Sequence, residues 1–191
     1  MTETRIVLMM GISLDGIVAV PSGPGLRPVM EGTAGLPAED PELTRMKMAW
    51  LRETGTHIMG RTTYQEMAGY WPSSTADYAA PMNEIPKVVF SKTLGDEDAR
   101  WPDSRVARGD LADEIDRLRR GSGKDVVAYG GSAFAQSLVR RDLIDEYRLV
   151  THPVAIGEGT RLFEDLPAPV RLSHVETRPF ESATVHVYAR T

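Results

Sequence analysis

The sequence contains no cysteine, and this absence excludes several kinds of protein. A small domain held together by disulfides, an enzyme with a thiol nucleophile and a metal site built from thiolates all require cysteine. Histidine is scarce as well, and the side chains present do not have the spacing of metal ligands: His57, His152, His174 and His186. We therefore predict no metal site, and we expect a reducing compartment.

Long hydrophobic runs and basic clusters are also missing. No apolar stretch approaches the roughly 18 residues of a membrane-spanning helix, and the N-terminal segment does not have the pattern of a secretory signal. The net charge is −5, and neighbouring arginines occur only as short pairs such as Arg119-Arg120. Because binding to nucleic acid requires a basic face, we predict a cytoplasmic protein with neither a membrane nor a nucleic acid as partner.

Apolar segments typical of strands alternate with segments of helical spacing along most of the chain. The predicted strands are 5–12, 57–60, 87–91, 105–108, 126–129 and 145–154, and the predicted helices are 41–53, 61–67, 110–119 and 132–140. Such alternation indicates a mostly parallel sheet covered on both faces. The last two apolar segments, on either side of 179–182, indicate an antiparallel pair. The sequence thus predicts a single α/β domain over residues 1–191, with a mixed sheet.

Two segments allow more than one use. Residues 21–41 contain five prolines and four glycines, which exclude a regular helix or central strand. This loop is either a solvated connector or a lid over a site beside the first strand. Tyr70, Trp71 and Tyr78 gather in the predicted loop 69–83, where they either form a wall for a planar heterocycle or serve packing or a dimer contact.

Three junctions that follow predicted strands carry residues suited to phosphate. The first backbone N–H groups of a helix have no partner inside the helix, and glycine lets an anion approach them closely. "YGGSAF" (129–134) has this form, and "MGRTT" (59–63) adds Arg61 with two hydroxyls. "FSKT" (90–93) offers Lys92 between Ser91 and Thr93. In open α/β sheets, ligands lie outside the carboxyl ends of the strands. We therefore expect the three junctions to share one dinucleotide.

The nature of this dinucleotide follows from the charges. The spacing does not match the G-x-G-x-x-G fingerprint, and no acidic residue is placed to hold a ribose 2′-hydroxyl. Cations at the junctions favour a 2′-phosphate instead. We predict NADPH rather than NADH as the cofactor. The alternative is that Arg61 and Lys92 are solvated and that the hydroxyls only cap helices.

In addition, the chain resembles a known family through five motifs in register. They are "ISLDGIVA" (12–19), "IMGRTTYQEM" (58–67), "PKVVFSKTL" (86–94), "YGGSAFAQSL" (129–138) and "THPVAIGEGTRLF" (151–163). These occur in the order seen in dihydrofolate-reductase-like proteins, and most resemble the reductase domain of the bifunctional riboflavin-pathway deaminase–reductase and its stand-alone bacterial relatives. The resemblance implies a three-layer α/β/α fold with antiparallel C-terminal strands, an NADPH-dependent reductase and a homodimer.

The resemblance also implies roles for individual residues. By position, the residues that bind the cofactor would be Gly60, Arg61, Thr62, Ser91, Lys92, Gly130, Gly131, Ser132, Ala133 and Phe134. The substrate side differs, because Met9 and Tyr129 replace the lysine and glutamate usual in riboflavin-pathway reductases. The carboxylate that holds the pterin in dihydrofolate reductases has no clear equivalent; Asp40, Glu42 or neither takes that place.

Reduction by hydride also requires a proton source. Asp15 and Tyr129 are the candidate catalytic residues, although Asp15 also fits a turn cap and Tyr129 a core position. We therefore expect an NADPH-dependent oxidoreductase acting on a small heterocyclic or imine-type substrate, of the 5-amino-6-(5-phosphoribosylamino)uracil reductase type. The alternatives are a non-catalytic NADPH-binding module, a pterin reductase of the dihydrofolate reductase type, or a purely structural scaffold.

Overall fold

The computed structural model describes residues 4–20, 40–121 and 123–191. The choice between connector and lid concerns residues 21–41, nearly all of which lie outside the described residues. Among those described, none of the helices has both the length and the apolar character needed to cross a membrane.

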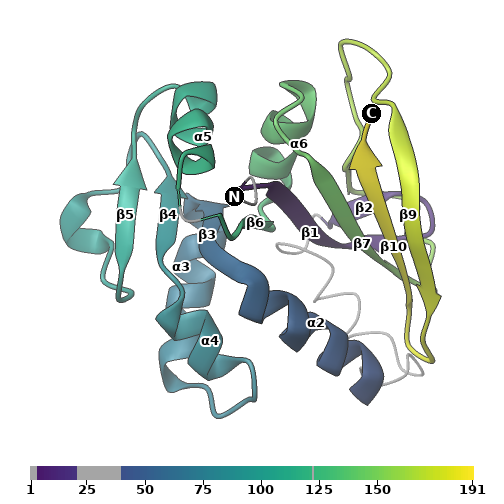
Figure 1. Ribbon diagram of the computed structural model, residues 1–191, viewed down its shortest axis with the longest axis horizontal. Helices are drawn as coiled ribbons and strands as arrows, with labels where there is room; N and C mark the ends of the chain where they lie inside the picture. The colour runs from purple at the N-terminus through teal and green to yellow at the C-terminus, as the bar shows by residue number, and fades with distance from the viewer. Residues whose placement is uncertain (1–3, 21–39, 122) are drawn as a thin grey trace.

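An eight-stranded sheet runs through the molecule in the order β5-β4-β3-β6-β1-β7-β10-β9 (Figure 1). Six of these strands are parallel, and β10 and β9 complete one side as antiparallel neighbours. The strands are β1 (Ile6–Ser13), β3 (Thr54–Gly60), β4 (Lys87–Phe90), β5 (Ser104–Ala107), β6 (Asp125–Tyr129), β7 (Glu146–His152), β9 (Leu172–Pro179) and β10 (Thr184–Arg190).

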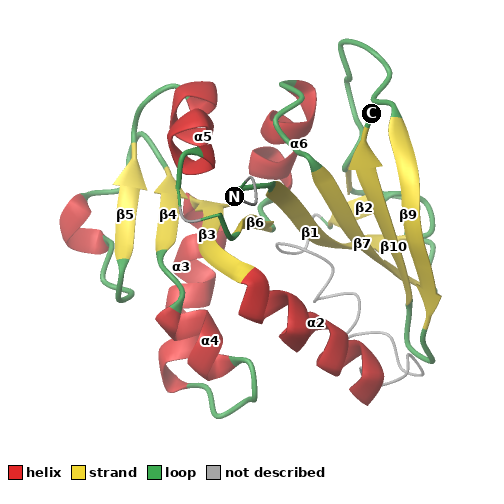
Figure 2. Cartoon of the chain, viewed as in Figure 1, coloured by secondary structure: helices red, strands yellow, loops and turns green. Residues whose placement is uncertain are grey.

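Helices cover both faces of the sheet, which gives three layers (Figure 2). One face carries α2 (Pro41–Glu53), α3 (Arg61–Tyr70) and α4 (Ala79–Glu84), whose apolar side chains pack on strand residues such as Met59 and Val150. The opposite face carries α5 (Leu111–Arg119) and α6 (Ser132–Arg140), which pack on residues such as Leu8 and Ala128. Because both faces are covered, β1, β4 and β6 consist mostly of apolar residues, as is typical of parallel sheets.

Most of the predicted elements are present within a few residues. The mixed α/β class and the mostly parallel sheet are confirmed, as are the antiparallel C-terminal strands. The helix predicted at 41–53 has these bounds, because Asp40 accepts a hydrogen bond from the N–H of Glu42 at 2.7 Å and Pro41 begins the first turn. Asp110 caps α5 in the same way.

The structure differs from the prediction in three places. β3 starts at Thr54, directly after α2 and before the strand predicted at 57–60, so Gly55 lies inside a strand. The segment 69–83, expected as a loop, contains the end of α3, a 3₁₀ turn at Trp71–Ser73 and the start of α4. A small pair of strands, β2 (Ile17–Ala19) and β8 (Thr160–Arg161), was not predicted.

The packing of α6 on the sheet can be tested at Leu138, which is 0% exposed within the main core. We expect Leu138→Ala to lower the free energy of unfolding by about 2–5 kcal/mol, because it removes buried methyl groups and leaves a cavity. Leu14→Ala is the control, because Leu14 is 67% exposed and its loss should cost less than about 0.5 kcal/mol. Urea unfolding of both variants measures the difference; equal losses would contradict this packing.

Candidate functional site

Two helices begin at the carboxyl edge of the sheet without a side-chain cap. α3 follows Gly60 at the end of β3, and α6 follows Gly131 just beyond β6, and at neither N-terminus does the capping residue offer a side-chain acceptor. α2 and α5 are different, because Asp40 and Asp110 occupy their first amides. The first N–H groups of α3 and α6 are therefore available to an anion, and each helix dipole adds a positive end.

The glycine pair explains why these two N-termini can lie together. Gly130 and Gly131 both have positive φ, at +49° and +74°, a conformation that residues with a Cβ rarely adopt. A Cβ on Gly131 would lie 3.0 Å from Oγ1 of Thr63, and a Cβ on Gly60 would lie 3.3 Å from Cβ of Phe134. The turn therefore requires glycine both for its dihedral angles and for the close approach of α3 to α6.

A cavity of about 290 Å³ opens between these two N-termini. Six of the predicted cofactor-binding residues line it, namely Gly60, Arg61, Thr62, Gly131, Ala133 and Phe134. Thr63, Phe90 and Ser137 complete the lining. The structure thus brings the phosphate junctions at 59–63 and 129–134 together at one site.

A second cavity, also of about 290 Å³, contains the remaining junction. Ser91 and Lys92 line it, and it shares Phe90, Phe134 and Ser137 with the first cavity. The two phenyl rings pack with their centroids 5.0 Å apart. Because the two cavities share these three lining residues, they adjoin. We call the two cavities together the groove, which extends from the N-termini of α3 and α6 to the N-terminus of α5.

The groove contains more cations than acids. Arg61 donates from Nη1 to Oγ1 of Thr93 at 3.1 Å, which joins the junction at 59–63 to the junction at 90–93. Lys92 is exposed. Arg141 also lines the second cavity, where it pairs with Asp110 at 3.0 Å. Sequence reasoning missed Arg141, and it interpreted Asp110 only as a helix cap. Nothing local in the sequence marks either as a groove residue, because 31 positions separate them.

Gly130 and Ser132 do not line either cavity, although they flank residues that do. Gly130 forms the left-handed turn before α6, and Ser132 is the first residue of that helix. Their predicted contacts with a cofactor remain a prediction. Within residues 4–20, 40–121 and 123–191, no group of three or more His, Asp or Glu side chains is arranged to hold a metal ion, and the predicted absence of a metal also remains a prediction.

Asp15 lies in the turn after β1, where its carboxylate is fully engaged. It accepts hydrogen bonds from Oγ of Ser13 at 2.6 Å, from the N–H of Gly157 at 2.7 Å and from the N–H of Ile156 at 3.1 Å. The bond from Ser13, followed by the two amides, lowers the pKa of Asp15 to about 2. Such a group is ionised at neutral pH and ties two loops together, which favours the turn-cap interpretation over proton donation.

Tyr129 ends β6 on the face of the sheet covered by α2. Its ring meets the ring of His57 edge-on, with centroids 4.9 Å apart, and packs against the apolar cluster beneath α2 and α3. Burial raises the pKa of the Tyr129 hydroxyl, so the phenol stays neutral and offers a hydrogen-bond donor. The residue directly precedes Gly130 and Gly131, so it lies next to the groove without lining it.

Comparison with known proteins identifies a family and relatives of this chain. The family described as "RibD C-terminal domain" matches residues 4–186. The uncharacterized protein YyaP of Bacillus subtilis is 26% identical over 97% of this chain and 94% of its own length.

Solved structures show the same fold. A putative riboflavin biosynthesis protein from Shewanella sp. PV-4 superposes with a TM-score of 0.76 and 21% identity, over 98% of this chain and 99% of that one. Dihydrofolate reductase from Enterococcus faecalis, solved with NADP(H), superposes with a TM-score of 0.62 and 14% identity, over 97% and 96% of the two chains. The fold is therefore of the dihydrofolate-reductase-like class.

The role of Asp15 as a tie between loops has a pH signature. Its folded-state pKa is about 2, below the roughly 3.9 of an unfolded aspartate. Its contribution is therefore complete above about pH 5 and declines as pH falls from about 4 towards 2. We expect Asp15→Asn to lower the melting temperature at pH 7 and to lose this effect near pH 2.

The control for this measurement is Asp77→Asn, on an exposed turn. Melting curves of wild type and both variants between pH 2 and pH 7 give the comparison. A deficit in Asp15→Asn that does not depend on pH would contradict an ionised carboxylate at this position.

Proposed function

The chain belongs to the family of the RibD C-terminal domain, and from this membership together with the groove we propose that it is an NADPH-dependent reductase of a small heterocyclic or imine-type substrate. The family relates it to the reductase domain of riboflavin biosynthesis, which makes an oxidoreductase the natural expectation. NADPH supplies the hydride in such reactions, and the protein supplies binding, orientation and electrostatics.

The observation that carries this proposal is the joined groove. Two uncapped helix N-termini, one from α3 and one from α6, open into its first half and suit the pyrophosphate of a dinucleotide. The apolar wall of Phe90 and Phe134 continues into its second half and suits an adenine ring. The glycine turns at Gly60 and Gly131 lie beside the exposed cations Arg61 and Lys92. This arrangement supports a ligand that is planar at one end and anionic at its centre.

The charges of the second half support NADPH over NADH. Lys92 is exposed beside Ser91, whose hydroxyl accepts hydrogen bonds from the amides of Thr93 and Leu94 and still has its own proton to donate. An acidic residue that holds a ribose 2′-hydroxyl is the usual mark of NADH binding. Asp110 is the acid in this cavity, and it already caps α5 and pairs with Arg141.

A nucleotide-binding module without catalysis is the second candidate. The observation in its favour concerns Asp15 and Tyr129, the two candidate proton donors. The carboxylate of Asp15 is ionised, and burial keeps the hydroxyl of Tyr129 neutral, so neither side chain readily gives up a proton. A pterin reductase of the dihydrofolate reductase type is a third candidate. Reduction through an ordered water requires neither side chain as an acid, so the reductase remains the better proposal. We further expect a cytoplasmic protein and, as the resemblance of the sequence to this family implies, a homodimer.

NADPH binding can be measured by thermal unfolding. At a concentration of one hundred times its dissociation constant, NADPH should stabilise the protein by about 2.7 kcal/mol. NADH at the same concentration should produce a much smaller shift in melting temperature, because it lacks the 2′-phosphate that Lys92 would bind. An equal shift with both nucleotides would contradict the predicted preference for NADPH over NADH. No shift with either nucleotide would contradict the proposed function.

The role of Lys92 is tested separately by substitution. We expect Lys92→Ala to weaken NADPH binding about tenfold or more, because it removes a charged donor to phosphate, and to leave NADH binding nearly unchanged. The control is Lys124→Ala, an exposed lysine just before β6 and therefore at the opposite edge of the sheet. Equal weakening of NADPH binding in both variants would point to a general charge effect.

A further inference from the structure

An ion pair lies at the end of the groove, in the second cavity. Asp110 precedes the first turn of α5, Arg141 follows α6, and both line this cavity together with the two phenyl rings. The two side chains approach within 3.0 Å of each other, yet they are 53% and 51% exposed. A ligand that lies against the phenyl rings would therefore meet a charged pair that is still accessible.

The carboxylate of Asp110 has one oxygen with unused capacity. Oδ1 accepts hydrogen bonds from the N–H of Ala112 at 2.8 Å and from Nη1 of Arg141 at 3.3 Å. Within the part of the chain that the structure describes, Oδ2 accepts only from the same Nη1, at 3.0 Å. Each oxygen of an ionised carboxylate can accept about two hydrogen bonds. The bond from Arg141, followed by that from Ala112, lowers the pKa of Asp110, so the carboxylate is ionised at neutral pH and Oδ2 can accept one more donor.

Arg141 has unused donors next to this oxygen. Nη1 is the only nitrogen of its guanidinium that has an acceptor among the described residues, which leaves Nε and Nη2. A guanidinium is planar, and its N–H groups point in fixed directions. The ion pair thus presents an open acceptor beside open donors.

The acid at this position calls for an explanation beyond the helix cap. Serine, asparagine and threonine also cap helices, and a half-exposed ion pair contributes little to stability. The same cavity contains Lys92 and suits an anion, so a carboxylate in it is unfavourable unless the ligand offers it a donor.

Adenine offers such a donor. Along one edge of the base, the 6-amino group is a donor and the neighbouring N7 is an acceptor. This pattern is complementary to an acceptor beside a donor. Hypoxanthine has an oxygen in place of the amino group, so an ionised carboxylate would bind the edge of adenine and repel the edge of hypoxanthine.

We propose that Asp110 and Arg141 recognise the adenine base of the cofactor: Oδ2 of Asp110 accepts from the 6-amino group, and Arg141 donates from Nε or Nη2 to N7. The base lies against Phe90 and Phe134 with this edge towards the ion pair. The inference rests on the proposed function, because the second cavity must hold the adenine end of the dinucleotide. It adds recognition of the base to the binding of the phosphates.

The test compares NADPH with its deamino analogue, in which hypoxanthine replaces adenine and every phosphate is unchanged. Asp110→Ser removes the carboxylate and keeps a hydroxyl that can cap α5. Its matched control is Asp40→Ser, because Asp40 caps α2 in the same way, through the N–H of Glu42 at 2.7 Å, and lines neither cavity of the groove. Both variants lose a capping carboxylate, and only Asp110→Ser loses it from the groove.

We expect wild type to bind NADPH about tenfold more tightly than the deamino analogue in calorimetric titrations, because the analogue loses a hydrogen bond to a charged acceptor. Asp110→Ser should lose this preference, and Asp40→Ser should keep it. The readout is the ratio of the two dissociation constants, since removing a negative charge near the phosphates affects both nucleotides alike.

Arg141→Met tests the second contact. Because N7 is present in both bases, this variant should weaken the binding of both nucleotides by about the same factor, roughly tenfold, and preserve the preference for adenine. Arg140→Met is the control for the lost charge, because Arg140 pairs with Asp165 and lines neither cavity of the groove. It should leave both constants within about twofold of wild type.

Equal binding of the two nucleotides by wild type would overturn the inference, as would a preference that survives in Asp110→Ser or disappears in Asp40→Ser as well. Equal weakening in Arg141→Met and Arg140→Met would overturn the contact to N7. Should Asp110→Ser fail to fold, the ratio in wild type and the result for Arg141→Met decide. Normal NADPH binding without a preference for adenine would defeat only this inference, whereas absent NADPH binding would defeat the proposed function.

Discussion

The site depends on two backbone turns at the carboxyl edge of the sheet, where β3 and β6 lead into α3 and α6 through glycine. Because Gly60 and Gly131 have no side chain, the two helices begin close together and their first amides stay open. The neighbouring strand β4 ends in a cation between hydroxyls, and the parallel order of the sheet brings this end to the same edge. Because β3, β4 and β6 are parallel, backbone donors, charged side chains and the aromatic wall all lie along the same groove.

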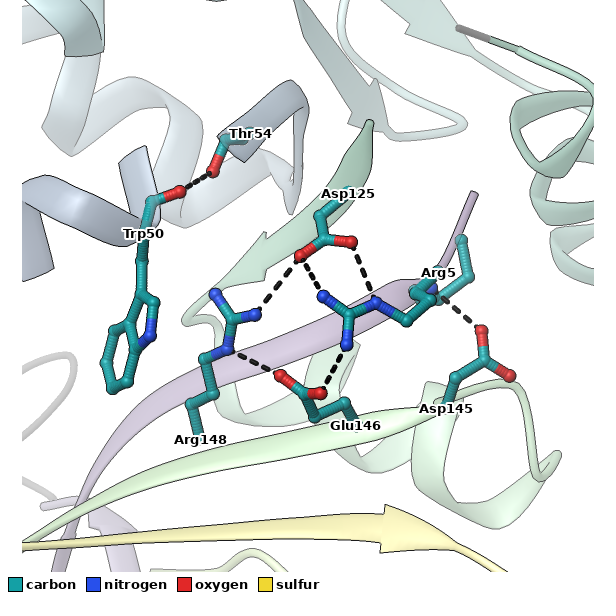
Figure 3. A network of polar contacts seen from close by, with 8 residues as sticks. Arg5, Trp50, Thr54, Asp125, Asp145, Glu146 and Arg148 are labelled. Atoms are coloured by element: carbon teal, nitrogen blue, oxygen red, sulfur yellow. Dashed lines mark hydrogen bonds and ion pairs between the residues drawn. The ribbon is translucent and has the colours of Figure 1, made fainter. Parts of the chain in front are cut away.

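The face of the sheet beneath α2 has a different character from the groove. On this face the polar groups are charged but balanced, with Arg5 and Arg148 against Asp125 and Glu146 (Figure 3). A balanced buried network contributes little net charge to a ligand, whereas the groove offers net positive charge. The groove therefore suits an anion, whereas the charges beneath α2 are already neutralised within the protein.

Local patterns in the sequence predicted the parts of this structure that local physics determines. Asp40 and Asp110 mark the starts of α2 and α5 by capping, and the apolar runs mark β1, β4 and β6. The start of β3 was missed because it depends on pairing with β6, in which Thr54 lies opposite Asp125 and Gly55 lies at an irregularity of the pairing. The charged network was missed for the same reason, since Arg5 meets its partners across 120 and 141 positions. Residues that line the groove were foreseen where they belong to a junction, and missed where only the tertiary fold brings them there, as it brings Arg141 beside Asp110.

The most direct test is a crystal structure of the protein with NADPH. The account predicts the pyrophosphate against the first amides of α3 and α6, the adenine beside Phe90 and Phe134, and the 2′-phosphate within reach of Lys92. A nucleotide bound at another face of the sheet, or in this groove with its phosphates away from Gly60 and Gly131, would contradict it.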